Sequence, residues 1–154
     1  MRILVGWDDA AEADLISLYL NVDQNDARVT TKPAEFFELA EREQWDVALM
    51  ALTFPDAENG LASFERARGL VGDTPIIAAS RPLEVYQLAS FVAGGLHSHI
   101  MRDTSGDYIF LLMPTVQAAH DAVTAERSRK LADRLRQEIE SVRRLQESVI
   151  PRNI

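Results

Sequence analysis

Short runs of apolar residues alternate with amphipathic segments along the first two thirds of the chain. The longest run is VALMAL, residues 47–52, which has no polar interruption. A run of this length is typical of a strand that is covered on both faces, as in a parallel sheet. We therefore predict a central strand at 47–52, a loop of turn-forming residues at 53–60, and a helix that begins near Gly60.

The same alternation of strand and helix occurs five times. Further strands are predicted at residues 2–6, 27–31, 74–79 and 98–101, and further helices at 10–22, 34–42, 61–71 and 82–92. In the helix at 10–22, the apolar spacing predicts an inward face made of Leu15, Ile16, Tyr19 and Leu20. Five such units predict an α/β fold with a doubly wound, five-stranded parallel sheet. In open α/β sheets, ligands and reacting groups lie at the carboxyl ends of the strands.

A long helical segment follows the last strand. From about Ser105 the sequence stays compatible with helix for more than forty residues, and Pro114 is expected to kink or restart it. Its second half carries one stripe of aliphatic residues, Leu131, Leu135, Ile139, Val142, Leu145 and Val149. A helix of this length cannot bury the stripe against a small domain, so we expect it to project and to form a homodimeric coiled coil. We divide the chain into a domain at 1–123 and a linker helix at 124–154.

Charge and composition limit the partners of the chain. The net charge is −8, but residues 126–154 carry +3 and the first 125 residues carry −11. An acidic domain disfavours nucleic acid. The absence of cysteine excludes disulfides and thiolate chemistry, and suits a reducing compartment. No apolar run is long enough to span a membrane and the amino terminus does not read as a signal peptide, so we expect a cytoplasmic protein without nucleic-acid or membrane partners.

The predicted strand ends resemble those of the receiver domain of two-component response regulators, over about residues 2–123. DVALMALTFPDAENG is similar to the phosphoacceptor segment, with Ala51 in place of the acceptor aspartate. PIIAAS places Ser80 at the hydroxyl position that contacts the phosphoryl group in the family. GGLHSHIMRD is similar to the fifth-strand segment, with Arg102 in place of the lysine and His99 in place of the switch aromatic residue. The resemblance implies that Ser80 and Arg102 contact an anion.

The first strand shows a further departure from the receiver pattern. In RILVGWDD, an ungapped match puts Trp7 where the family has its first acid and leaves Asp8 and Asp9, whereas a one-residue shift restores both acids. The resemblance implies a flavodoxin-like (CheY-like) fold and a place in bacterial phosphorelay signalling. In the family, the carboxylate at the Ala51 position accepts phosphate and helps to hold Mg²⁺, and a methyl group can do neither. We expect a pseudo-receiver without catalytic residues, and Mg²⁺ is not expected as a cofactor, although Asp8 and Asp9 leave a residual acidic pocket.

A second resemblance lies at the end of the chain. LADRLRQEIESVRRLQESVIPRN is similar to the linker helix that runs from a receiver into a SpoIIE-like metal-dependent serine phosphatase domain, with Leu145, Gln146 and Pro151 at the entrance motif. The metal-binding aspartates of that phosphatase would follow Ile154. The resemblance therefore implies a non-catalytic regulatory and dimerisation module that passes a signal to a downstream serine/threonine phosphatase.

Alternatives stay open for the acids and histidines. A receiver could accept phosphate on Asp8, Asp9 or Asp56 instead, and the first two could equally cap the following helix. His97 and His99 share a strand face at a spacing compatible with metal, without a third ligand in view. An enzyme on the same fold is the last alternative. It lacks a glycine-rich phosphate loop after the first strand, and the strand ends do not supply a nucleophile with its base.

Overall fold

The structure is a computed structural model that describes residues 1–149. The side chain of Val149 and all of Pro151 lie outside the described part, so the predictions for them stay untested. Residues 1–120 form one compact unit, and a second unit begins at Asp121.

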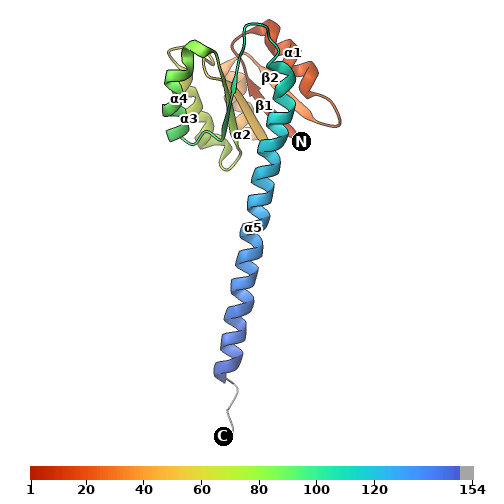
Figure 1. Ribbon diagram of the computed structural model, residues 1–154, viewed down its shortest axis with the longest axis vertical. Helices are drawn as coiled ribbons and strands as arrows, with labels where there is room; N and C mark the ends of the chain where they lie inside the picture. The colour runs from red at the N-terminus through yellow and green to blue at the C-terminus, as the bar shows by residue number, and fades with distance from the viewer. Residues whose placement is uncertain (150–154) are drawn as a thin grey trace. The chain divides into compact units, whose positions relative to one another are not determined.

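The first unit is built on a five-stranded sheet (Figure 1). Its strands are β1 (Arg2–Gly6), β2 (Asp26–Thr30), β3 (Val47–Ala51), β4 (Ile76–Ser80) and β5 (Ser98–Met101). The helices are α1 (Ala10–Leu20), α2 (Pro33–Arg42), α3 (Gly60–Val71), the 3₁₀ helix η1 (Pro82–Gln87), α4 (Leu88–Ala93) and α5 (Ile109–Val149). The sheet order is β2-β1-β3-β4-β5 and all pairs are parallel, which confirms the predicted doubly wound fold.

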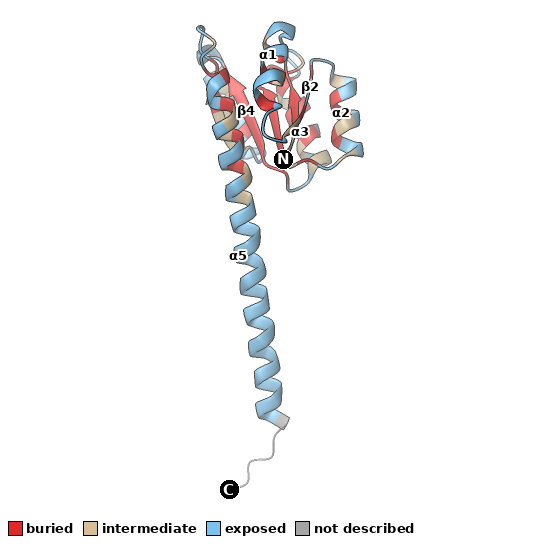
Figure 2. Cartoon of the chain, turned by 90° about the vertical axis from the view of Figure 1, so that its right-hand side faces the viewer, coloured by how far each residue is buried: buried red, intermediate tan, exposed pale blue. Residues whose placement is uncertain are grey.

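Helices cover both faces of this sheet. Because strand–helix–strand crossovers are right-handed, α1 must lie on the face opposite to α2, α3 and α4 in this strand order. The beginning of α5 shares the face of α1, since the rings of Tyr19 and Phe110 meet edge to face with centroids 5.0 Å apart. Figure 2 shows the buried residues gathered in the strands and on the inner sides of these helices. All five residues of β3 and all five of β4 are buried.

The register of the sheet brings the strand ends together. Gly6 at the end of β1 pairs with Met50, so the residues that follow β1 lie beside Ala51 at the end of β3. Ala51 in turn pairs with Ala79, and Ser80 pairs with Met101 on β5. The segments that leave β1, β3, β4 and β5 therefore meet along one edge of the sheet.

Helix α3 begins in close contact with the end of β3. A Cβ atom added to Gly60 would lie 2.0 Å from the carbonyl oxygen of Leu52, which is backbone and cannot move aside alone. Only glycine allows this approach, and it fixes the start of α3 beside the site at the strand ends.

Two details of the helices differ from the predictions. In α1, the prediction is confirmed for Ile16 and Leu20, which are buried, and wrong for Leu15 and Tyr19, which are 46% and 40% exposed; Ala13 completes the inner face instead. The predicted helix at 82–92 is two pieces, η1 and α4. The first piece, η1, has the sequence PLEVYQ and contains no buried residue. Because little packing holds this segment, it adopts the tighter 3₁₀ turns.

Helix α5 is continuous through Pro114, so this proline does not start a new helix. It is the sixth residue of the helix, and its missing N–H removes only one hydrogen bond of the helix ladder. In the second unit, every described side chain from residue 124 onward is exposed. Within residues 1–149 there is no helix with a segment apolar and long enough to cross a membrane.

Candidate functional site

A network of charged and aromatic side chains lies at the carboxyl ends of the strands. Trp7 and Asp8 directly follow β1, and Arg102 directly follows β5. Glu12 comes from the first turn of α1, and Tyr108 directly precedes α5. The parallel sheet brings these five residues together although they are up to 101 positions apart in the sequence.

Arg102 is the centre of the network. Its side chain is 2% exposed. Nη1 donates to Oδ2 of Asp8 over 3.1 Å, and Nη2 lies 3.0 Å from Oδ1 of the same carboxylate. Nη2 also donates to Oε2 of Glu12 over 2.5 Å. One buried guanidinium is therefore shared by two carboxylates, a geometry that suits arginine and that lysine cannot reproduce.

Two aromatic rings enclose the guanidinium. The Arg102 guanidinium carbon lies 4.6 Å from the ring centroid of Trp7, a cation–π contact. The Trp7 ring, fully buried, stacks on Tyr108 with centroids 6.2 Å apart. Both rings also donate to Glu12, from Nε1 of Trp7 over 3.3 Å and from the hydroxyl of Tyr108 over 2.6 Å. Trp7 thus fills the space beside the ion pair and takes part in its hydrogen bonding.

The network changes the acidity of its members. Burial alone would raise the pKa of Asp8, but hydrogen bonds from Arg102 and Thr53 and the positive charge of Arg102 bring this pKa below its ordinary value of 3.8. Burial alone would lower the pKa of Arg102, and the hydrogen bonds and charges of Asp8 and Glu12 raise it instead. Burial and the Glu12 carboxylate raise the pKa of Tyr108. Asp8 is thus held ionised and Tyr108 is held protonated.

The end of β3 carries no reactive group. Ala51 is 2% exposed and offers only a methyl group at this position. Two residues further on, the buried hydroxyl of Thr53 donates to Oδ2 of Asp8. Arg81, which follows β4, adds a second positive charge 3.7 Å from the same oxygen. The Asp8 carboxylate is therefore surrounded by donors and cations of the chain itself.

Ser80 and His99 form a separate pair. The Ser80 hydroxyl is fully buried, and its oxygen lies 2.5 Å from Nε2 of His99 on the neighbouring strand. Burial lowers the pKa of His99, which favours the neutral ring. The predicted anion contacts Ser80 and Arg102 thus have partners within the protein, His99 for the first and Asp8 with Glu12 for the second.

The other candidate acids lie outside the network. Asp9 is the N-cap of α1, because its Oδ1 accepts from the backbone N–H of Glu12 over 2.9 Å. Asp56 lies in the loop before α3 and accepts from the Asn59 side chain and backbone, which lowers its pKa. Neither acid is brought to Arg102 in the described structure.

The residues at the strand ends do not fit a bound Mg²⁺. This ion requires several oxygen ligands in near-octahedral geometry. Ala51 supplies none, and Oδ1 of Asp8, which has no hydrogen bond among the described residues, already faces the Arg102 cation at 3.0 Å. Across residues 1–149, no cluster of three His, Asp or Glu side chains has the geometry of a metal site. A second cation here would be repelled by the guanidinium.

Glu12, Thr53 and Tyr108 were not identified from the sequence as site residues. The spacing of Glu12, four residues after Asp8 at the start of a predicted helix, is a weak signal that its side chain faces the strand end. Thr53 and Tyr108 lie in connecting segments, where no periodicity indicates the direction of a side chain.

Comparison with solved structures agrees with the strand order. The chain is similar to a CheY-like response regulator receiver domain from Methanospirillum hungatei, with a TM-score of 0.71 and 22% identity over 81% of this chain and 97% of that one. It is also similar to the receiver domain of a sensor histidine kinase from Pseudomonas aeruginosa, which has magnesium in its active-site cleft, with a TM-score of 0.64 and 18% identity over 78% and 97%.

A third similar structure is a fusion that contains the trimeric coiled coil of yeast Spc42, with a TM-score of 0.69 and 16% identity over 97% of this chain and 96% of that one. No protein-family model matches the sequence, and no curated protein matches it. By sheet order, helix placement and structural similarity, the chain has the CheY-like receiver fold.

Proposed function

We propose that this chain is a non-catalytic, receiver-like signalling module that is not phosphorylated at the Ala51 position and acts by association. One observation carries the proposal. The buried guanidinium of Arg102 is bound by Asp8 and Glu12 at the strand ends, beside an alanine at the end of β3. The acids that remain at this edge are thus neutralised by a side chain.

The chemistry of phosphoryl transfer supports this reading. An acceptor needs a nucleophilic carboxylate, and a developing phosphoryl charge needs cations that are free to bind it. Ala51 supplies no nucleophile. Arg102 is engaged on both Nη atoms, so an incoming anion would have to displace Asp8 and Glu12 from it. The arrangement therefore favours a fixed scaffold over a phosphorylation site.

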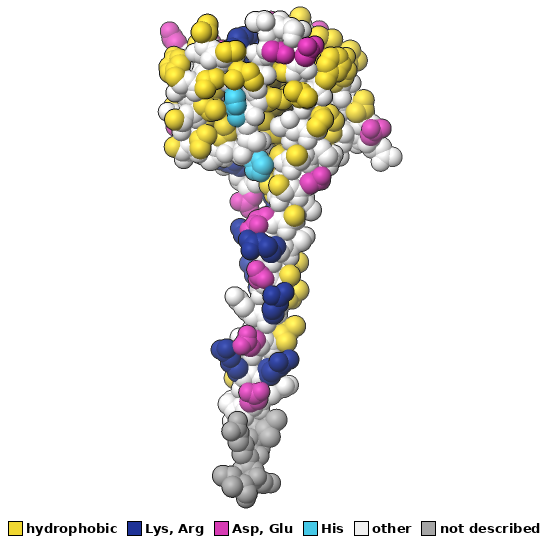
Figure 3. All heavy atoms as spheres, viewed as in Figure 1, with side chains coloured by type: hydrophobic (Ala, Val, Ile, Leu, Met, Phe, Trp, Pro, Cys, Tyr) yellow, Lys and Arg dark blue, Asp and Glu magenta, His cyan; other side chains and the backbone are white. Residues whose placement is uncertain are grey.

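The second unit supports an output by dimerisation. Five aliphatic side chains of α5 beyond residue 130 are 50–64% exposed, namely Leu131, Leu135, Ile139, Val142 and Leu145. Figure 3 shows apolar side chains following one side of this helix while charged side chains lie elsewhere on it. Fully burying an exposed aliphatic side chain stabilises by about 1.5–3 kcal/mol, and these side chains would gain the part of it that corresponds to their exposed fraction. The fitting occupant is the same stripe of a second copy, as in a coiled coil.

We further propose that the paired helices pass a conformational bias to a serine/threonine phosphatase domain beyond Ile154. The resemblance of residues 131–153 to a linker helix of such proteins supports this output. A coiled coil can carry a signal if two arrangements of its helices differ by only a few kcal/mol. The regulated phosphatase would then respond to association of the module with a partner in the bacterial cytoplasm.

Acetyl phosphate with Mg²⁺ tests the proposal. Intact-mass spectrometry is expected to show no stable phosphoryl adduct on this chain, while a receiver domain with its acceptor aspartate, treated in parallel, becomes modified. A phosphoryl group on Asp8, Asp9 or Asp56 would overturn the proposal in favour of a receiver with a substitute acceptor. Peptide mapping after borohydride trapping would locate it.

A further inference from the structure

The charges that flank the aliphatic stripe define how two copies can pair. In a coiled coil, positions a and d of each heptad form the seam, and charges at e and g set the partner and the orientation. Placing Ile139 at position a puts Leu135 and Val142 at d, and puts Glu138 at g and Arg143 at e. Leu135, Ile139 and Val142 are 50%, 62% and 55% exposed, as expected of seam residues on an unpaired helix.

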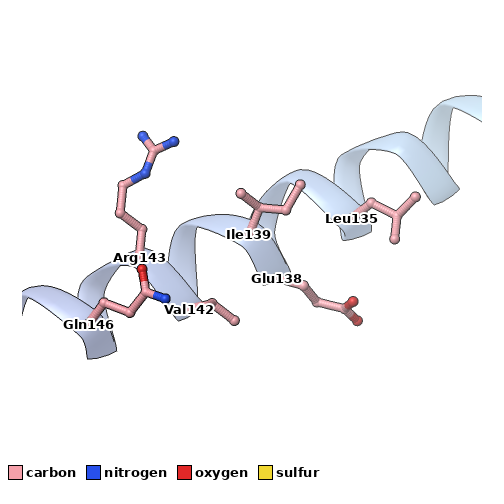
Figure 4. A pocket seen from close by; sticks show the side chains of 6 residues that line it. All are labelled: Leu135, Glu138, Ile139, Val142, Arg143 and Gln146. Carbon is pink, nitrogen blue, oxygen red and sulfur yellow. The ribbon is translucent and has the colours of Figure 1, made fainter.

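The surface of the helix shows this arrangement directly. A shallow groove is lined by Leu135, Glu138, Ile139, Val142, Arg143 and Gln146. Figure 4 shows Ile139 and Val142 between Glu138 and Arg143, whose charged ends extend away in different directions. The groove therefore consists of an apolar floor with a negative side chain on one flank and a positive one on the other.

A competing heptad register is less favourable. Placing Leu135 and Val142 at a would bring Leu131 and Leu145 to d, but it would also bring Glu138 into the seam, where a buried unpaired charge is costly. With Ile139 at a, the only polar side chains near the centre of the seam are Gln146 and Ser128. A neutral polar residue in the seam lowers stability but fixes the alignment.

Neither flanking charge is used within its own helix. Arg129 and Arg136, the two preceding e residues, pair with Glu126 and Asp133 of the same helix. Across residues 1–149, no ion pair or hydrogen bond involves the side chain of Glu138 or Arg143. These two side chains are thus available for a second copy.

The arrangement of e and g residues distinguishes parallel from antiparallel pairing. In a parallel, in-register pair, g of one helix faces e of the next heptad on the other, so Glu138 meets Arg143 of the second copy, and symmetry makes this contact twice. In an antiparallel pair, e faces e, and the e positions here are Arg129, Arg136 and Arg143. Arginine would then face arginine.

We infer that two copies of this chain pair through α5 as a parallel, in-register, two-stranded coiled coil, held in orientation by reciprocal Glu138–Arg143 ion pairs. The inference rests on the dimerisation proposed above and adds its geometry. Ile139 at a with Leu135 at d also favours two strands over three.

Cysteine cross-linking tests the orientation, because the chain contains no cysteine and each introduced one is unique. Ser128→Cys, Leu135→Cys and Val142→Cys place thiols at d positions spread over about 21 Å of helix. On mild oxidation, a parallel pair links each variant to itself, and all three are expected to form disulfide dimers. Gln137→Cys, on the opposite side of the helix, is the control and should stay monomeric on a non-reducing gel.

Charge reversal gives a second readout that leaves the seam intact. Glu138→Arg and Arg143→Glu are each expected to weaken dimerisation roughly tenfold, and the double variant is expected to return to within about twofold of the unaltered chain. If the double variant instead dimerises more weakly than either single variant, Glu138 and Arg143 do not form ion pairs between the two copies.

The possible outcomes distinguish a failure of the parallel pairing from a failure of the dimerisation proposed above. If sedimentation finds the unaltered chain monomeric, the proposed dimerisation itself fails. A dimer in which at most one cysteine variant cross-links is not a parallel, in-register pair and overturns the inference alone, and a trimer overturns the two-stranded geometry.

Discussion

Arg102 and Asp8 meet side on, with Nη1 3.1 Å from Oδ2 and Nη2 3.0 Å from Oδ1. This two-pronged contact joins the residue after β5 to the second residue after β1. Since Nη2 also binds Glu12, the same guanidinium ties the start of α1 to both strand ends. The contact therefore links three elements of the first unit at the edge where the receiver fold places its site.

Removing the cation should destabilise the fold strongly. Arg102→Met leaves Asp8 and Glu12 without their buried partner, and we expect a loss of about 3–5 kcal/mol in the free energy of unfolding. Urea unfolding at one fixed protein concentration measures it. Arg42→Met is the matched control, because Arg42 forms an exposed pair with Glu38 at 2.9 Å and should cost about 0–1 kcal/mol. Equal losses in the two variants would contradict a structural role for the network.

Acid should weaken the fold through Asp8. Its pKa is lower in the folded chain than the ordinary 3.8, so the unfolded chain takes up the proton first as the pH falls. The stabilising contribution is fully present above about pH 4 and is lost as the pH falls through the lower folded pKa. In unfolding measured from pH 6 down to about pH 2, Asp8→Asn should show a shallower decline than the unaltered chain. Asp14→Asn, which removes a carboxylate from the exposed side of α1, is the matched control.

Magnesium should not stabilise the unaltered chain. Because Arg102 occupies the acids, millimolar MgCl₂ should leave the melting temperature where NaCl of equal ionic strength leaves it. In Arg102→Met, Asp8 and Glu12 lose their cation, and Mg²⁺ should then raise the lowered melting temperature in part. A larger magnesium effect on the unaltered chain than on the variant would show that the guanidinium does not take the place of the ion.

Two glycines of α3 should respond in opposite directions to the same substitution. Gly60→Ala drives a methyl group against the Leu52 carbonyl, so we expect a loss of more than about 2 kcal/mol. Gly69→Ala meets nothing within 4 Å inside a helix and should gain about 0.5–1 kcal/mol. Thermal unfolding of both variants compares them directly, and a tolerated Gly60→Ala would show that the start of α3 can shift.

The aliphatic stripe should control the oligomeric state. Ile139→Asp puts a charge in the middle of the stripe and is expected to make the chain monomeric in sedimentation at tens of micromolar, where we propose that the unaltered chain is a dimer. Gln137→Asp adds the same charge on the opposite side of the helix and should leave the dimer in place. Dissociation by both variants alike would indicate a general effect of charge on the helix.

The inner strands β1, β3 and β4 could be predicted because each contains an uninterrupted apolar run. VALMAL is one such run, and the structure confirms β3 within it, ending one residue earlier at Ala51. Strand order then follows from the resemblance to receivers, and the parallel geometry places Asp8, Ala51 and Arg102 at one edge.

The contacts within the site could not be predicted, because side-chain directions depend on tertiary packing. Glu12 and Tyr108 reach the guanidinium from a helix turn and a loop, and no spacing in the sequence relates residue 12 to residue 108. The same limit explains the inner face of α1, where apolar spacing fits two arcs of the helix and only packing on the sheet selects the arc that includes Ala13 and leaves Leu15 and Tyr19 outside. The split at residue 88 depends on weak packing, which the sequence does not reveal.

A bound ion exchanges with the surrounding solution, whereas a guanidinium on the polypeptide cannot leave. The positive charge beside Asp8 and Glu12 is therefore present in every copy of the chain at all times, whatever the supply of free divalent ions or phosphate donors in the cell. In this chain, the polarity of the strand edge is therefore a property of the fold itself.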